Sequence, residues 1–169
     1  MNLRNFLFLP ATALAVLLVG CGFHLAKEAQ LPASMQRVHI AIADAGSPLA
    51  KDLAKALPRS GVTVVDQAGP GVAVMNITAN SISTDVLSVG GNARANEYAL
   101  RYHVEFEVDD AAGVAILPKQ TIELSREFTF DATQALGVAA EVDLLTKELE
   151  HDMVQTILRR IDAMSRVKH

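Results

Sequence analysis

The chain contains little cysteine and no excess of basic residues. Cys21 is the only cysteine among its 169 residues, so an internal disulfide is excluded and the fold must be stabilised by side-chain packing. Lysine and arginine together number 15, against 19 aspartate and glutamate residues, which gives a net charge of -4. Because nucleic-acid binding requires a basic face for the phosphates, this composition argues against nucleic acid as a partner.

The sequence also lacks the motifs of common catalytic and metal sites. It contains no G-x-S-x-G, no G-x-G-x-x-G and no P-loop. The five histidines include no pair at the H-x-x-x-H spacing of a helical metal site, and no second cysteine could join them. Glu105 and Glu107 share one face of a predicted strand, but no nucleophile or base stands beside them. We therefore expect no catalysis, no metal and no cofactor.

The first 20 residues have the composition of an export signal. One positive charge, Arg4, precedes an almost wholly apolar stretch over residues 6–18, and small residues follow. This stretch is too short for a membrane-spanning helix, which needs about 20 residues. We expect residues 1–20 to be a signal peptide that is removed on export.

Cys21 directly follows those small residues, and Leu18-Val19-Gly20-Cys21 resembles the lipobox of bacterial lipoproteins. The resemblance implies that the thiol of Cys21 accepts a diacylglyceryl group and that its amine is acylated after cleavage. Two or more acyl chains give stable anchoring to a membrane. The alternative is a buried free cysteine at the edge of an apolar run. On the first interpretation, residues 21–34 form a lipidated tether.

Residues 35–169 are expected to form a single domain. The predicted strands cover residues 37–42, 62–65, 72–88 (with a bulge near Asn80), 98–109 and 121–130, and the predicted helices cover residues 49–57 and 141–164. Ser47 followed by Pro48 favours the start of the first helix. The order β-α-β-β-β-β-α predicts an α+β two-layer sandwich. Its sheet is mostly antiparallel, with four or slightly more strands, and its two helices lie on one face.

Two of the predicted elements have a clear buried face. In the strand over residues 98–109, alternate residues are apolar, and the opposite face carries Arg101, His103, Glu105 and Glu107. Apolar residues at three- and four-residue spacing mark the core face of the last helix; they are Val142, Leu145, Leu149, Met153, Ile157, Ile161 and Met164. Arg126 interrupts the apolar face of the strand over residues 121–130.

Short segments spread along the chain resemble the LptE family of LPS-assembly lipoproteins. They are Cys21-Gly22-Phe23-His24-Leu25, Leu31-Pro32, Asn96-Glu97-Tyr98-Ala99-Leu100, Arg126, Phe130-Asp131, Leu136-Gly137, Glu141 and Gln155-Thr156-Ile157-Leu158-Arg159-Arg160. Each segment alone carries little information. Their order and spacing make the set specific, and it spans nearly the whole chain after Cys21.

This resemblance implies a fold, a location and a partner. Members of the family are α/β sandwiches held at the inner leaflet of the outer membrane. They sit as a plug inside the β-barrel of the LPS-assembly protein LptD, help that barrel to fold, and take part in placing lipopolysaccharide in the outer leaflet. Gly22 replaces the aspartate that often retains lipoproteins in the inner membrane, which fits an outer-membrane destination.

The resemblance further implies contacts with lipopolysaccharide. In the family, positive residues in the loop before the Glu-Tyr strand and in the loop after Phe-Asp are implicated. Here Arg94 is the only cation of the first loop, residues 90–94, and the second loop has none. We therefore predict Arg94 and Arg126 as contacts for lipopolysaccharide phosphates. The alternatives are a solvated loop arginine at 94 and a structural ion pair at 126.

Three classes of function stay open at this point. An LptE-like plug and assembly factor would form a stoichiometric complex with a very large β-barrel. An auxiliary lipoprotein of a periplasmic phospholipid transport system would instead associate with an inner-membrane transporter or its tunnel-forming partner. A lipid-anchored hydrolase would turn over an ester or a glycoside, and the residues give it little support.

Overall fold

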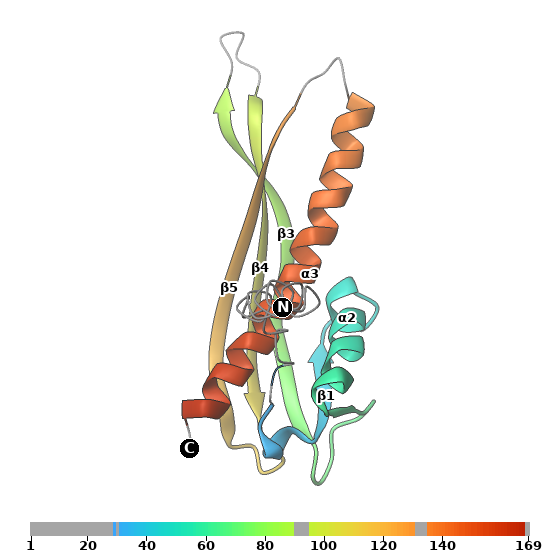
Figure 1. Cartoon of the computed structure of the whole chain (residues 1–169), viewed down its shortest axis with the longest axis vertical. Helices are drawn as coiled ribbons and strands as arrows, with labels where there is room; N and C mark the ends of the chain where they lie inside the picture. Colours follow the sequence, from blue (N-terminus) through green and yellow to red (C-terminus); the bar gives the residue numbers. More distant parts are fainter. Residues whose placement is uncertain (1–28, 30, 90–94, 131–134, 168–169) are drawn as a thin grey trace, which may run out of the picture.

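The computed structural model describes residues 29, 31–89, 95–130 and 135–167. A five-stranded sheet in the order β2-β1-β3-β4-β5 carries both α-helices on one face (Figure 1), which confirms the predicted α+β sandwich. In chain order the elements are η1 (Ala33–Met35), β1 (Arg37–Ile42), α2 (Pro48–Ala56), η2 (Leu57–Ser60), β2 (Thr63–Val64), β3 (Ala73–Val89), β4 (Ala95–Asp109), β5 (Ala115–Thr129) and α3 (Ala135–Val167).

The sheet has a wide part and a narrow part. Strands β3, β4 and β5 are long and antiparallel, whereas β1 is parallel to both of its neighbours. β1 pairs with β3 only over Ala73–Ile77. The remainder of β3, Thr78–Val89, pairs with β4 alone among the described strands. We call the three-stranded part of the molecule its distal half; it is the upper half in Figure 1.

The two helices differ in length, and this decides what they cover. At 1.5 Å per residue, the 33 residues of α3 extend about 50 Å, whereas the nine residues of α2 extend about 14 Å. At about 3.3 Å per residue, the 17 residues of β3 extend about 56 Å. α3 therefore runs along the full length of the sheet, while α2 ends level with its wide part (Figure 1).

The core lies between the helices and the inner face of the sheet. Phe106 at the middle of the sheet and Leu53 of α2 are fully buried together with the stripe of α3 at Leu149, Met153 and Ile157. The α3 stripe confirms the helical spacing in the sequence. No helix among the described residues has both the length and the apolar character needed to cross a membrane.

Local signals start and end α2 as the sequence predicts. The hydroxyl oxygen of Ser47 accepts a hydrogen bond from the backbone N–H of Ala50 at 3.3 Å, and Pro48 occupies the first helical position. After η2 the chain turns at Gly61, whose φ of 80° lies in the left-handed region that favours glycine.

The largest differences from the predicted boundaries are at the starts of α3 and β5. α3 begins at Ala135, six residues earlier than residue 141, and β5 begins at Ala115, six residues earlier than residue 121. The irregularity in β3 lies between Ile77 and Ala79, slightly before the bulge predicted near Asn80.

Candidate functional site

Two of the three residues singled out from the sequence lie outside the described residues. Cys21 belongs to the N-terminal segment and Arg94 to the loop between β3 and β4. Lipidation of Cys21 and lipopolysaccharide binding by Arg94 therefore stay predictions.

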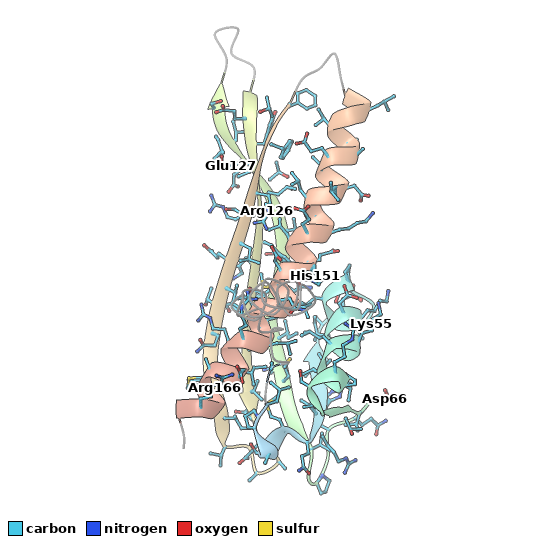
Figure 2. The ribbon with its side chains drawn as sticks, in the orientation of Figure 1. Lys55, Asp66, Arg126, Glu127, His151 and Arg166 are labelled. Carbon is cyan, nitrogen blue, oxygen red and sulfur yellow. The ribbon has the colours of Figure 1, made fainter. Side chains whose placement is uncertain are left out.

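Arg126, the third residue, forms an ion pair between the sheet and α3. It lies on β5 opposite Leu100, on the inner face of the sheet. Its Nη2 donates to Oδ2 of Asp152 at 2.5 Å, and its Nε lies 3.8 Å from a carboxylate oxygen of Glu148. Figure 2 labels Arg126 on β5, beside α3. The structural alternative for Arg126 is thus present in the structure. Contact of Arg126 with lipopolysaccharide stays a prediction. A ligand could still reach the guanidinium, because 36% of the side chain is exposed.

The outer face of the sheet is covered with charged side chains that pair across strands. Arg101 Nε donates to Asp85 at 2.6 Å, and Lys119 Nζ lies 2.5 Å from Glu105. The hydrogen bond with Asp85 raises the pKa of Arg101, and the hydrogen bond from Lys119 lowers the pKa of Glu105. The alternation in the sequence correctly assigned Arg101 and Glu105 to this face, which no described helix covers.

A second group of polar residues lies where α2, α3 and the inner face of β4 meet. The hydroxyl of Tyr102 donates to Oδ1 of Asn80 at 2.9 Å, and burial, followed by the charges of Glu150 and Asp52, raises the pKa of Tyr102. Burial and the neighbouring carboxylate of Asp52 also raise the pKa of Glu150. Glu150 forms no hydrogen bond or ion pair with any described residue. The sequence analysis did not single out Glu150, which lies next to Leu149 of the buried α3 stripe and is itself partly buried.

Large apolar side chains are exposed mainly in the distal half. On β3, Ile82, Val86 and Leu87 are 39%, 55% and 46% exposed, and Leu144 of α3 is 57% exposed. Tyr98 and Phe128 stack near the same end, with ring centroids 5.3 Å apart. Ile82 and Val86 lie opposite Tyr102 and Tyr98 and share the inner face of the sheet. The short length of α2, which leaves both residues uncovered, could not be inferred from the alternation within β3.

No group of three or more histidine, cysteine, aspartate or glutamate side chains among the described residues could hold a metal ion. An open hollow of about 500 Å³ lies beside η2 and β2, and its lining contains no titratable group; it is formed by Ala54, Pro58, Gly61, Val62, Thr63 and Val64.

Comparisons with known proteins give one consistent result. The model of the LptE family, described as lipopolysaccharide-assembly, matches residues 35–161. The LPS-assembly lipoprotein LptE of Yersinia pestis is 31% identical over 150 residues, which cover 88% of this chain and 72% of the relative. The corresponding protein of Photorhabdus laumondii is 28% identical over 149 residues, 88% of this chain and 81% of the relative.

A solved structure agrees with the sequence comparisons. The solution NMR structure of lipoprotein B from Nitrosomonas europaea superposes with a TM-score of 0.72 at 31% sequence identity. The match covers 86% of this chain and 93% of that protein, so the similarity includes the sheet and both helices.

Proposed function

Because the chain belongs to the LptE lipopolysaccharide-assembly family, we propose that it is an outer-membrane lipoprotein that plugs the β-barrel of LptD. The observation that carries this proposal is the family match over residues 35–161, which includes almost every described element. Membership of this family gives the chain a role in lipopolysaccharide assembly, and the family is not one of enzymes. The plug would help the barrel to assemble and take part in delivering lipopolysaccharide to the outer leaflet.

The charged outer face of the sheet supports a plug. The lumen of a large outer-membrane barrel is polar, so a protein seated in it needs a polar surface that stays folded there. Cross-strand ion pairs such as Arg101 with Asp85 and Lys119 with Glu105 hold that surface in a fixed arrangement. The packed core beneath it gives the rigidity that a plug requires.

The anchor in this proposal is lipid attached to Cys21. The first described residues that pack against the core are Ala29 and Leu31. Eight residues from Cys21 to Ala29, fully extended, span at most about 29 Å. The folded domain would therefore stay close to the periplasmic surface of the membrane that holds the lipid.

We propose that Arg94 contributes more to lipopolysaccharide binding than Arg126 does. A phosphate that binds Arg126 must compete with Asp152, which already accepts a hydrogen bond from its guanidinium at 2.5 Å. Arg94 lies between β3 and β4 in the sequence and is the only cation between residues 90 and 94. We expect Arg94→Ala to weaken lipopolysaccharide binding more than Arg126→Ala does.

The test is a detergent pull-down of the tagged, lipidated protein from outer membranes, with mass spectrometry of the proteins that co-purify. A one-to-one complex with a large outer-membrane β-barrel is the expected result. Capture of an inner-membrane transporter without any barrel would overturn the proposal and favour the alternative, a periplasmic phospholipid transport system.

A further inference from the structure

The sheet has three free edges, and two of them are protected against pairing with another strand. β2 is an edge of only two residues. The edge strand β5 contains Pro118 and four charged side chains, and α3 lies along it. Short strands, proline and charge are the devices by which proteins prevent an edge from pairing with another chain.

The third edge is the distal part of β3, and it lacks these devices. Thr78–Val89 is 12 residues long, contains no proline, and has one charged residue. That residue, Asp85, is already paired with Arg101 of β4. β1 ends at Ile42, which pairs with Ile77. Beyond that point, every second residue of β3 directs its backbone N–H and C=O away from β4, with no described strand beside them.

The inner face beside this edge presents apolar side chains at alternate positions. Ile82 and Val86 lie opposite Tyr102 and Tyr98 and therefore point to the core side, yet both are exposed. An added strand would cover them with its own alternate side chains. An extended polypeptide fits this edge, because an added strand can hydrogen-bond to the free backbone groups and also place alternate side chains on Ile82 and Val86.

The charge near this edge favours a partner over a second copy. Glu150 acts electrostatically on Tyr102, which pairs with Ile82, and Asp52 lies close to Glu150. Two copies paired through this edge would bring their own acidic groups together, which is unfavourable. A segment with a basic side chain would instead neutralise Glu150. The charge of Lys147 also acts on Glu150, but Lys147 forms its ion pair with Asp143 at 2.7 Å.

We propose that the free edge of β3, Thr78–Val89, accepts an extended segment of the barrel partner as an additional strand. The segment has apolar side chains that pack on Ile82 and Val86 and a basic side chain that reaches Glu150. The identity of the partner rests on the proposed function; the edge and its chemistry come from the described residues.

The first experiment compares the capture of the barrel by lipidated variants. Val86→Lys and Ile82→Lys place a charge on the exposed inner face of the edge and should lower the co-purified barrel about tenfold, or 1.4 kcal/mol. Val114→Lys is the matched control: Val114 is 60% exposed in the turn between β4 and β5 at the other end of the molecule. The melting temperatures of the free variants should stay close to that of the unsubstituted chain.

A photocrosslinking pair locates the contact. Ser83 and Ser125 are both exposed and both lie opposite Arg101, Ser83 on the free edge strand and Ser125 on the protected one. p-Benzoylphenylalanine at Ser83 should crosslink to the barrel, and at Ser125 it should do so much less. Glu150→Gln adds a third readout, because it should stabilise the free chain while weakening capture.

The possible outcomes separate this proposal from the proposed function. If the unsubstituted chain captures the barrel and Val86→Lys captures it equally well, strand addition is wrong and the plug proposal stands. If no barrel is captured by any form, both proposals are overturned. If Val86→Lys changes only the self-association of the chain in sedimentation, the edge pairs with a second copy and the barrel proposal for it is overturned.

Discussion

At the scale of single residues, Arg126 shows how a charged side chain can occupy an apolar face. Its ion pair with Asp152 joins β5 to α3, but both side chains are more than a third exposed, so solvent screens the interaction. A double-mutant cycle with Arg126→Met and Asp152→Asn should give a coupling free energy of about 0.5–1 kcal/mol by urea unfolding. Added salt should reduce it. Perfect additivity of the two single substitutions would contradict the ion pair.

Glu150 gives a second residue-scale prediction, on the dependence of stability on pH. Burial raises the pKa of Glu150, so the folded state favours the protonated carboxyl. The stabilisation of the fold by this proton is fully present below the unfolded pKa of about 4.3, and it is lost as the pH rises through the folded pKa. Glu150→Gln should therefore raise the melting temperature at pH 7 and have little effect near pH 4. Glu148→Gln is the control, since Glu148 lies 3.8 Å from Arg126 and is half exposed. An equal gain from both substitutions would refute the burial argument.

At the scale of elements, α3 is divided between a packed side and an exposed side. Ile157→Ala removes a fully buried side chain and should cost about 2–5 kcal/mol of unfolding free energy. Leu144→Ala removes an apolar side chain of the same size that is 57% exposed, and it should change stability by less than about 1 kcal/mol. Chemical denaturation of both variants measures the difference, and similar losses would show that α3 packs in another register.

The early start of α3 and of β5 shows why the sequence prediction missed two boundaries. Val138 is buried and lies four residues before Val142, so it continues the apolar stripe, but Gly137 and the neighbouring alanines hide the period. In β5, Pro118 interrupts the alternation in a segment that nevertheless pairs with β4. A proline is tolerated there because β5 is an edge strand with a side that needs no hydrogen bond.

The element order and the buried faces could be predicted because each depends on a local period in the sequence. The polar face with Arg101 and Glu105 and the stripe with Leu149 and Met153 are examples. The free edge of β3 could not be predicted in this way. The edge is free because β1 and α2 are much shorter than β3, and because β3 pairs with β4 alone beyond Ile77. The alternation within a single strand reveals neither the lengths of the other elements nor the strand pairing.

At the scale of the whole molecule, the proposed anchor at Cys21 and the folded domain belong to different parts of the sequence. The described residues that form the core or pack against it run from Ala29 to Met164, and Cys21 precedes the first of them by eight positions. Fold and membrane attachment should therefore respond to different substitutions. In the proposed function, the lipid positions the plug while the sheet and helices make the protein contacts.

Cys21→Ala, expressed behind a signal peptide that is cleaved without lipidation, separates the proposed anchor from the fold. Without the thiol no diacylglyceryl group can be attached, and stable anchoring needs at least two acyl chains. The variant should move from the detergent phase to the aqueous phase in Triton X-114 partitioning while its melting temperature stays the same. Barrel capture in detergent should also persist, since the proposed contacts belong to the sheet. Detergent-phase partitioning of Cys21→Ala would show that another part of the chain holds the membrane, and loss of barrel capture would place the lipid itself in the interface.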